Sequence, residues 1–385
     1  MSNQENAPRT PRSLVDHLKE MADPRMDRTR DHKLIDILVI GLCTMLTVGD
    51  HFTDMEDFGK AKFDWLKTFL ELPNGIPSHD TFNRVFQAID PAQFLDCFVR
   101  WVQATCTALA GEQVAIDGKA LRRALDDGQK MPYIVNAWAC GNGLVLGQVK
   151  VDDKSNEITA IPELLRVLEL EGCVVSIDAM GCQKDIAAKI VDAKADYVLA
   201  LKGNHANVHD EFTEYFNDAV PVGSDAKTPL PEAMDFHETI EKGHGRIEIR
   251  RCWHTTDIDW FEDKELWAGL QSVGMVESIR QVNGETTIER RLYLSSLPLD
   301  AKRFGQLVRG HWGVENTVHW TMDVVFGEDQ SRSRTNNAAQ NLATLRRIAL
   351  NLVKKDDTPK LSMRRKRNRA GLDDSFLAKL IVSVR

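Results

Sequence analysis

Several features of exported and membrane-embedded proteins are missing from this sequence of 385 residues. The longest apolar stretch, residues 34–48, contains Asp36 and is too short to span a bilayer. The polar N-terminus lacks the apolar core of a signal peptide. The seven cysteines lie far apart without a CxxC pair, which indicates reduced thiols in a protein core. We therefore expect a cytoplasmic protein that has no membrane partner.

Common catalytic signatures are also scarce. The sequence has none of the usual motifs of a covalent nucleophile, and it has neither an HExxH motif nor a cysteine pair that would support a zinc site. We find no internal repeat and no low-complexity region. These absences point away from covalent catalysis and make a zinc site the weaker of the metal sites considered below.

Positive charge is distributed unevenly along the chain. The net charge of −8 argues mildly against a nucleic-acid partner, because phosphate binding depends on Lys and Arg. Residues 301–385, however, contain 17 Lys and Arg against 8 Asp and Glu. The run MRRKRNR at 363–369 supplies only five of these cations, so a solvated basic tail does not explain the rest. The asymmetry predicts one face or end that meets a polyanion.

The first 110 residues are predicted to be all-helical. Apolar residues recur at helical spacing in LIDILVIGLCTML, FDWLKTFLEL and AQFLDCFVRWVQATCTAL, and Pro and Gly separate these segments. Ser78 is well placed to cap a short helix over 79–89. Short helices of this kind fit either a DNA-reading helix-turn-helix or an ordinary helical packing unit.

From residue 113 the pattern changes to strands. The segment QVAID ends at Asp117, PYIVNAWAC and LVLGQVKV follow around a Gly-Asn-Gly turn, and CVVSID ends at Asp178. Helices are predicted over 158–170 and 184–195, and the strand YVLAL follows the second helix. The first three strands form a meander, and the helical crossovers make the next two strands parallel. This order predicts an α/β fold with a mixed RNase H-like sheet and flanking helices.

The last third of the chain is predicted to contain a mainly β insertion followed by helices. Alternating segments such as RIEIRRCWH and TTIERRLYLSSL indicate strands. Helix returns over 301–326 and 337–354, and the apolar stripe of the second segment leaves Arg346 and Arg347 outside it. The expected organisation is therefore a helical N-terminal domain at 1–110, a catalytic core at 111–216, the insertion at 217–298, further core helices at 299–355 and a basic tail at 356–385.

Asp117 and Asp178 are the first candidates for a metal site. Each closes a strand, and in a sheet of this order the first and fourth strands are neighbours. Two carboxylates that converge at adjacent strand ends are costly unless they are protonated or neutralised by a cation. Mg²⁺ prefers carboxylate oxygen, and two ions roughly 3.5–4 Å apart can activate a nucleophile and stabilise a leaving oxygen. Either aspartate alone also fits an ordinary loop-flanking residue, but the pair predicts a two-metal site.

The segment VRGHWGVENTVHWTMDVVFGED offers a third carboxylate. Spacings of four residues place four polar side chains on one helix face, namely His311, Glu315, His319 and Asp323. A solvated face, an interhelical polar network and a zinc site are the alternatives. We expect the tryptophans of this segment, Trp312 and Trp320, and also Trp253 in the insertion, to be packing residues.

Four blocks of the sequence resemble the ISAs1-family (H-repeat-associated) transposases, which belong to the DDE group related to IS4. They are IDGKALRRA, VVSIDAMGCQKDIAAKIVDAKADYVLALKGNH, GHGRIEIRR and HWGVENTVHWTMDVVFGEDQSRSRTNNAAQNLATLRRIALNLVK. The resemblance covers about residues 34–355. It implies a DDE transposase with Asp117, Asp178 and Glu315 as the catalytic triad. It also implies two Mg²⁺ or Mn²⁺ ions and DNA cleavage at element ends, followed by strand transfer.

The sequence departs from the wider IS4 pattern, which has Tyr, Arg and Lys at fixed offsets from the glutamate. Val308, His311 and Met322 occupy those offsets, whereas the ISAs1 version HW-x-x-EN-x-x-HW is kept. The hairpin chemistry and phosphate contacts of the IS4 branch are therefore not carried over.

Cationic and imidazole side chains near the expected site are candidates for DNA contact. Some follow the strand-end aspartate or the fifth strand, others lie in the insertion, and others lie on the C-terminal helices. An exposed loop or hairpin cation without a ligand is the alternative for these positions. The candidates are Lys119, Arg122, Lys202, Arg246, Arg250, His311, His319 and Arg346.

The expected partner is double-stranded DNA, comprising the terminal inverted repeats of the element and the target DNA. A homodimer on DNA is expected because two ends are brought together, and the protein would be nucleoid-associated when bound. One alternative is a nuclease of the same fold that joins nothing. Another is a non-catalytic DNA-binding remnant of an element.

Overall fold

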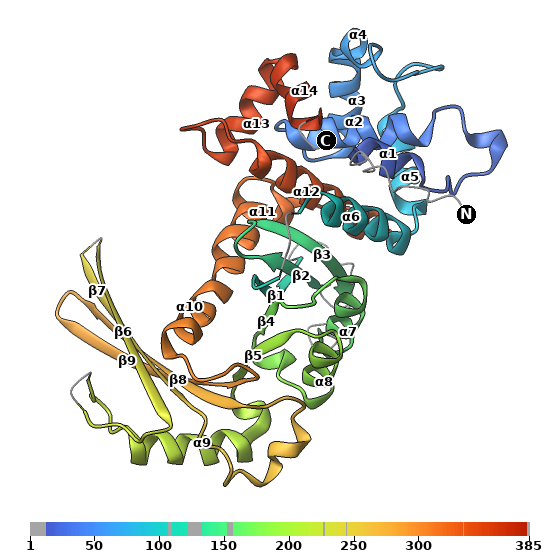
Figure 1. Cartoon of the computed structure of the whole chain (residues 1–385). Coiled ribbons are helices and arrows are strands. Elements are labelled where there is room, and N and C mark those ends of the chain that lie inside the picture. Colours follow the sequence, from blue (N-terminus) through green and yellow to red (C-terminus); the bar gives the residue numbers. More distant parts are fainter. Residues whose placement is uncertain are drawn as a thin grey trace, which may run out of the picture.

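The computed structural model shows helices from both ends of the chain packed together beside a nine-stranded mixed sheet (Figure 1). None of the described helices is long and apolar enough to cross a membrane. All seven cysteines are free, as predicted. The structure describes residues 13–106, 110–121, 133–151, 157–225, 228–243, 245–333 and 335–382.

The N-terminal region is helical, as the apolar periodicity predicts. Ser78 caps its helix by accepting a hydrogen bond from the Thr81 backbone, and Asp90 caps the next helix just before Pro91. Nearly every residue of α2 is buried, because other helices cover it on all sides. The helices are α1 (Leu14–Lys19), α2 (Leu34–Leu46), α3 (Phe52–Ala61), α4 (Phe63–Leu66), α5 (His79–Ala88) and α6 (Pro91–Thr105).

The first five strands have the predicted order. β1 pairs antiparallel with β2 and parallel with β4, while β5 extends the sheet parallel to β4. Their outer edge, β3, is covered by α12, where Asn351 exchanges two hydrogen bonds with the backbone of Val145. The strands are β1 (Gln113–Ala120), β2 (Tyr133–Ala139), β3 (Leu144–Val151), β4 (Val174–Ile177) and β5 (Asp196–Leu201).

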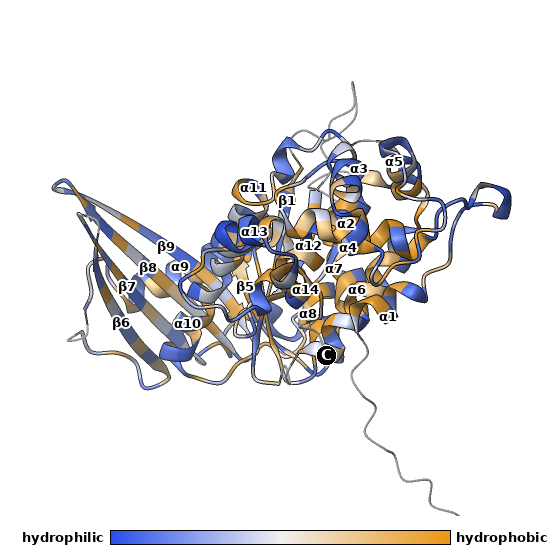
Figure 2. Ribbon diagram, turned by 90° about the horizontal axis from the view of Figure 1, so that it is seen from above, coloured by the Kyte–Doolittle hydropathy of each residue, from blue (hydrophilic) through white to orange (hydrophobic). Residues whose placement is uncertain are grey.

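The β-rich insertion continues the same sheet. β9 pairs antiparallel with β5, so the full strand order is β3-β2-β1-β4-β5-β9-β8-β7-β6. A tight turn with positive φ at Asn283 and Gly284 joins β8 to β9. Figure 2 shows hydrophobic and hydrophilic residues alternating along these strands, which is typical of strands with two different faces. The strands are β6 (Met234–Gly243), β7 (Arg246–Thr255), β8 (Ser272–Val282) and β9 (Glu285–Ser295).

Helices cover both faces of the sheet. α7 (Glu157–Val167) and α8 (Lys184–Asp192) are the two crossover helices, and α9 (Ala206–Ala219) packs on the insertion. α10 (Ala301–His311) contacts strands of the first half and of the insertion alike. It packs closely there, since a Cβ added at Gly274 would lie 2.3 Å from the Phe304 ring.

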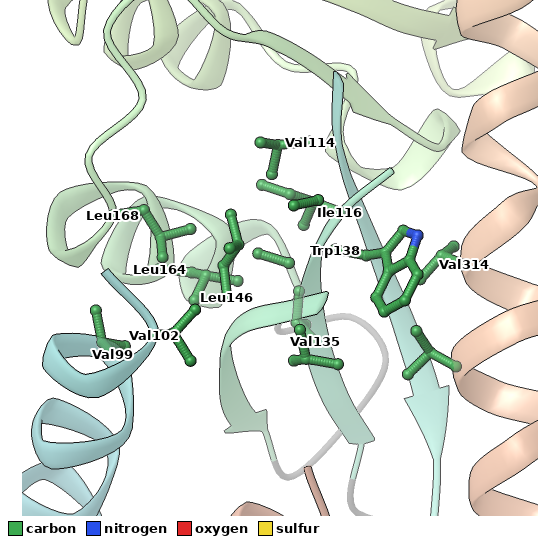
Figure 3. Packing of buried hydrophobic residues seen from close by; sticks show 14 of the residues in the cluster. Val99, Val102, Val114, Ile116, Val135, Trp138, Leu146, Leu164, Leu168 and Val314 are labelled. Carbon is green, nitrogen blue, oxygen red and sulfur yellow. The ribbon is translucent and has the colours of Figure 1, made fainter. Parts of the chain in front are cut away.

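The hydrophobic core joins the N-terminal helices to the sheet. Figure 3 shows Val99 and Val102 of α6 beside Leu164 of α7, and it shows Val314 beside Trp138 of β2. Burying each such side chain stabilises the fold by about 1.5–3 kcal/mol. Val314 directly precedes Glu315, so this packing holds the start of the glutamate-bearing segment against the sheet.

The C-terminal segment differs from the sequence expectation. Residues 356–385 were expected to be a basic tail, but they include two helices, α13 (Met363–Leu372) and α14 (Asp374–Val382), which contact α2. The helix before them, α12 (Ala338–Lys355), lies between the sheet and the N-terminal helices and is buried on all sides. Arg346 and Arg347 are therefore buried, which corrects the expectation that they lie outside the packed face.

Candidate active site

Asp117 and Asp178 come directly after the last parallel residue pair of β1 and β4. β4 ends at Ile177, just before Asp178, but β1 continues to Ala120, so the expectation that Asp117 closes its strand is wrong. The parallel register of β1 and β4 pairs Ile116 with Ile177, and the two aspartates are the next residues on each chain segment. Asp178 also caps the turn that follows, because its Oδ1 accepts a hydrogen bond from the Met180 backbone at 3.1 Å. The tight turn needs Gly181, where an added Cβ would lie 2.3 Å from the side chain of Ile177.

One cavity of about 130 Å³ unites the three predicted carboxylates. Asp117 lines it from within β1, Asp178 lines it from the end of β4, Glu315 lines it from the helical segment after α10, and Lys202 lines it from the end of β5. Glu315 and Lys202 are exposed to solvent. A solvent-accessible cavity with three carboxylates and a cation suits a phosphate-bearing ligand together with divalent ions.

The carboxylates have the right chemistry for a hard divalent cation, but they are not gathered into a finished site. Among the described residues, no three His, Cys, Asp or Glu side chains lie close enough to hold one metal ion. The carboxylates of Asp117, Asp178 and Glu315 are ligands of the kind that Mg²⁺ and Mn²⁺ prefer. Binding a shared ion therefore requires these side chains, Glu315 included, to move toward one another.

Glu315 begins a short π-helical turn. The turn spans Glu315–His319, between α10 and α11 (Trp320–Val324), and the Trp320 N–H donates to the Glu315 carbonyl five residues earlier. Such turns insert one extra residue into a helix and occur often at functional sites. His311 and Glu315 face the cavity, whereas His319 and Asp323 face residues of β1.

Lys119 lies beneath the cavity instead of at its mouth. We expected this residue to contact DNA, but its side chain is only 7% exposed. Its Nζ pairs with Asp323, with Glu328 at 2.9 Å and with Asp329 at 3.6 Å. Because Lys119 is two residues after Asp117, it points to the same face of β1 and is covered by the segment that follows α11. It is therefore unavailable to a phosphate in this structure.

Glu328 is the centre of this buried charge network. Burial alone would raise its pKa, but Arg347 and Lys119 outweigh burial and hold the pKa of Glu328 well below its usual range. Arg347 donates to Glu328 at 3.0 Å and also to Asn136 of β2 at 3.0 Å. The network therefore links β1, β2 and α12 directly behind Asp117.

His319 borders this network. Its Nδ1 lies 3.7 Å from Asp117 Oδ2, which is too far for a hydrogen bond. Burial, assisted by the nearby positive charges of Lys119 and Arg347, lowers the pKa of His319 to about 3. The side chain is only 13% exposed, so this predicted DNA contact lies in the wall behind Asp117.

His311 is held by a chain of hydrogen bonds. Gln113 Nε2 donates to the Leu307 carbonyl at 2.6 Å, which fixes the orientation of the amide, and it also donates to Ser176 Oγ at 2.7 Å. Ser176 Oγ lies 3.1 Å from His311 Nδ1. Burial lowers the pKa of His311, while the charge of Asp178 and a contact with the Ser176 backbone oppose that change.

The other predicted DNA contacts fall into different environments. Arg246 and Arg250 are on β7 and both pair with Glu248, the first at 2.8 Å. Arg346 is buried and donates to the Asp50 carbonyl at 3.2 Å, so it is not a surface contact. Arg122 lies outside the described residues.

Three cavity residues were missed by the sequence reasoning. Arg291 and Tyr293 of β9 line the cavity, since the insertion continues the sheet, and Trp312 forms part of its rim. The Arg291 guanidinium lies 4.7 Å from the Trp312 ring centre. Trp312 is 39% exposed and Trp320 is 56% exposed, which corrects the expectation that both are packing residues. Trp253 is fully buried, as expected.

Comparisons with known proteins agree with this geometry. Residues 15–102 match the family described as DDE_Tnp_1-associated, and residues 111–352 match the Transposase DDE domain family. The chain is 40% identical over 377 residues to the putative transposase YncI of Escherichia coli O157:H7, covering 96% of this chain and 95% of that protein.

A second relative covers the chain equally fully. It is the H repeat-associated putative transposase YhhI of Escherichia coli strain K12, which is 37% identical over 383 residues, or 96% of this chain and 98% of that protein. Asp117, Asp178 and Glu315 all lie within the range matched by the Transposase DDE domain family. The sheet of this range has the RNase H-like arrangement. This chain belongs to the DDE transposase family, and to its H repeat-associated members in particular.

Proposed function

We propose that this transposase cleaves DNA at the ends of its element and joins those ends to target DNA, with Asp117, Asp178 and Glu315 as the metal-binding catalytic residues. The observation that carries the proposal is that all three carboxylates line one cavity, although Glu315 is more than 130 residues from Asp178 in sequence. The family match supports the same reaction class.

The three carboxylates would hold Mg²⁺ or Mn²⁺, two ions in the usual arrangement. When bound, the ions would activate a water or a 3′-hydroxyl and neutralise the charge that develops on phosphate oxygens. The residues of the chain supply the rigid part of the site. Asp117 and Asp178 are fixed by the pairing of β1 with β4, while Glu315 is carried by the π-helical turn.

His311 is suited to donate a hydrogen bond to a phosphate oxygen. Because both amide hydrogens of Gln113 are used, Ser176 Oγ accepts from Gln113 and its own hydrogen is free for His311 Nδ1. An imidazole that accepts at Nδ1 carries its hydrogen on Nε2. The His311 ring lines the cavity, so this Nε2–H is the donor available there.

Lys202 supplies a positive charge at the cavity, which Arg291 of β9 also lines. Lys202 is exposed, follows β5 directly and lies at the same edge of the sheet as the aspartates. A lysine in this place would hold the phosphate next to the one that is cut. The DNA bound there would be the terminal inverted repeat of the element and then the target, with two chains holding two ends.

The decisive experiment measures cutting and joining separately. Purified protein is incubated with duplexes that carry the element ends, with Mg²⁺, with Mn²⁺ or with a chelator. Asp117→Asn, Asp178→Asn and Glu315→Gln should each lower cleavage by more than about a thousandfold while the thermal unfolding midpoint stays near that of the parent protein. Asp210→Asn, on the exposed face of α9, is the matched control and should cut normally.

Pre-cut ends then test the joining step. Metal-dependent transfer of such ends into target DNA supports a transposase, whereas cutting without joining would leave a nuclease of the same fold. Undiminished cleavage by any of the three carboxylate variants would remove that residue from the proposed site. DNA binding without any cleavage would indicate a non-catalytic remnant.

A further inference from the structure

The helix α13 concentrates positive charge more than any other described helix. Its ten residues, MRRKRNRAGL, include five Lys and Arg and no acid. A run of this kind is often only a solvated surface, so its meaning depends on which side chains are anchored and which are free.

Two of the five cations are anchors inside the protein. Lys366 pairs with Asp356 at 3.2 Å, and Arg367 pairs with Asp50 at 3.2 Å. Arg367 also donates to the Met45 carbonyl at 3.1 Å, and its guanidinium lies 4.3 Å from the Phe326 ring centre. Both side chains are buried, so they fix the position and rotation of the helix.

The opposite face of α13 is open. Arg364, Arg365 and Asn368 are exposed, as is Lys360 just before the helix. Within the described part of the chain, neither arginine nor Lys360 forms an ion pair. Arg369 is also exposed but lies 3.4 Å from Asp373. The helix therefore presents two unneutralised arginines and one amide on one side, and unpaired Lys360 precedes it; these four residues are here called the α13 face (Lys360, Arg364, Arg365 and Asn368).

Most arginines of the insertion are neutralised in contrast, although exposed Arg280 of β8 forms no ion pair among the described residues. Arg251 pairs with Glu238 at 2.8 Å, Arg290 pairs with Glu277 at 2.8 Å, and Arg291 pairs with Glu289 at 2.8 Å. An arginine that already holds a carboxylate must release it before it can hold a phosphate. The free cations of the α13 face have no such cost.

Arg367, on the buried side of α13, attaches this helix to the segment that carries Glu315. Arg367 donates to the Val325 carbonyl, and Val325 directly follows α11. α11 in turn carries Asp323, which pairs with Lys119 of β1 two residues beyond Asp117. Figures 1 and 2 both show α13 next to α11.

We propose that the α13 face binds the phosphate backbone of double-stranded DNA without reading its sequence. The choice of DNA as the ligand rests on the proposed function, whereas the placement of the exposed cations does not depend on it. Free Arg and Lys side chains and an Asn amide are the groups that bind phosphate oxygens in protein–DNA complexes. Such contacts release condensed counterions, so they have a measurable salt dependence.

The test measures the affinity for a duplex at several salt concentrations, by fluorescence anisotropy, with Ca²⁺ to prevent cutting. For the Arg364→Gln/Arg365→Gln variant, the slope of log affinity against log salt should become shallower by about 1.8, because two phosphate contacts are lost. The loss should be equal on element-end and random-sequence duplexes. The matched control is Lys19→Gln/Lys194→Gln, which removes two exposed cations elsewhere and should keep the parent slope.

Three outcomes would overturn the proposal. They are a parent-like slope in the α13 variant, an equal loss in the control variant, and a loss confined to element-end DNA. Arg364 and Arg365 make no ion pairs in the described structure, so the thermal midpoint should not change and misfolding is separable. Failure of the catalytic proposal is also distinguishable, because the Asp117→Asn variant should not cut yet should keep the full salt slope.

Discussion

The charges behind Asp117 and the charges on the insertion illustrate two different uses of ion pairs. Glu328, Lys119 and Arg347 are buried together between β1, β2 and α12. On β7 of the insertion, Arg250 and Glu248 form a pair whose side chains are partly exposed. Arginine–glutamate ion pairs therefore occur both in the low-dielectric interior and at the surface of this protein.

The difference lies in what happens when one partner is removed. A buried ion that loses its partner cannot regain water, so breaking a buried pair is costly. A surface ion exchanges its partner for water, and such pairs are worth about 0–1 kcal/mol. Counting basic residues in the sequence cannot separate these cases, whereas their burial in the structure does.

The largest effect is expected when Arg347 is removed. Arg347→Met should lower the free energy of unfolding by about 3–5 kcal/mol, because among the described residues Glu328 would keep one ion-pair partner, Lys119, and the unbonded charge of Arg346. Chemical denaturation checks this value. The double variant Arg347→Met/Glu328→Gln should recover much of the loss, and a single-variant loss below about 1 kcal/mol would remove the contrast with the surface pairs.

A smaller effect is expected from His254, which is buried in the insertion and forms no ion pair among the described residues. Burial lowers its pKa to about 4, although Asp300 and Asp235 oppose this. The unfolded state, with a pKa near 6.5, binds the proton first, so stability should fall by about 3 kcal/mol as the pH decreases from about 6.5 to 4.

Equilibrium unfolding of the parent and of His254→Asn across this pH range measures the effect. Asn cannot titrate, so the stability difference between the two proteins should shrink at low pH. Parallel curves would show that His254 does not cause the acid loss.

The smallest effect is expected on β7. Arg246→Gln/Arg250→Gln should change the free energy of unfolding by less than about 1 kcal/mol, since its ion pairs are partly exposed. Its salt slope for DNA should fall by less than that of the α13 variant, because Glu248 competes with phosphate. If the salt slope fell as much as or more than in the α13 variant, Arg246 and Arg250 would be the main contacts to the DNA phosphate backbone.

Much of the fold follows from the sequence alone. The strand end before Asp178, the crossover helices and the cap at Ser78 were predictable, because each depends on local periodicity or on turn chemistry. β1, in contrast, runs on to Ala120, beyond the end predicted at Asp117. The neighbouring, parallel placement of β1 and β4 agrees with the predicted strand order. The convergence of two aspartates at one sheet edge could therefore be foreseen without a structure.

The remaining features depend on long-range packing. Nothing local indicates that β9 pairs with β5, so Arg291 and Tyr293 were not recognised as cavity residues. The helical stripe of α12 does not show that both of its faces are covered, so Arg346 was assigned to the surface. The extra residue of the π-helical turn at Glu315 also leaves no clear mark in the periodicity.

β9 is both the last strand of the insertion and a wall of the cavity. Its first residue, Glu285, is at the hairpin turn, and Tyr293 is at the cavity, eight residues farther along. At about 3.4 Å per residue these two points are roughly 27 Å apart, which is close to the length of eight stacked base pairs. β8 pairs with β9 along this whole length, and β5 pairs with it from Leu292 to Ser295, so the ladder holds this distance. The length of β9 therefore sets the distance between the cavity and the tip of the β8–β9 hairpin.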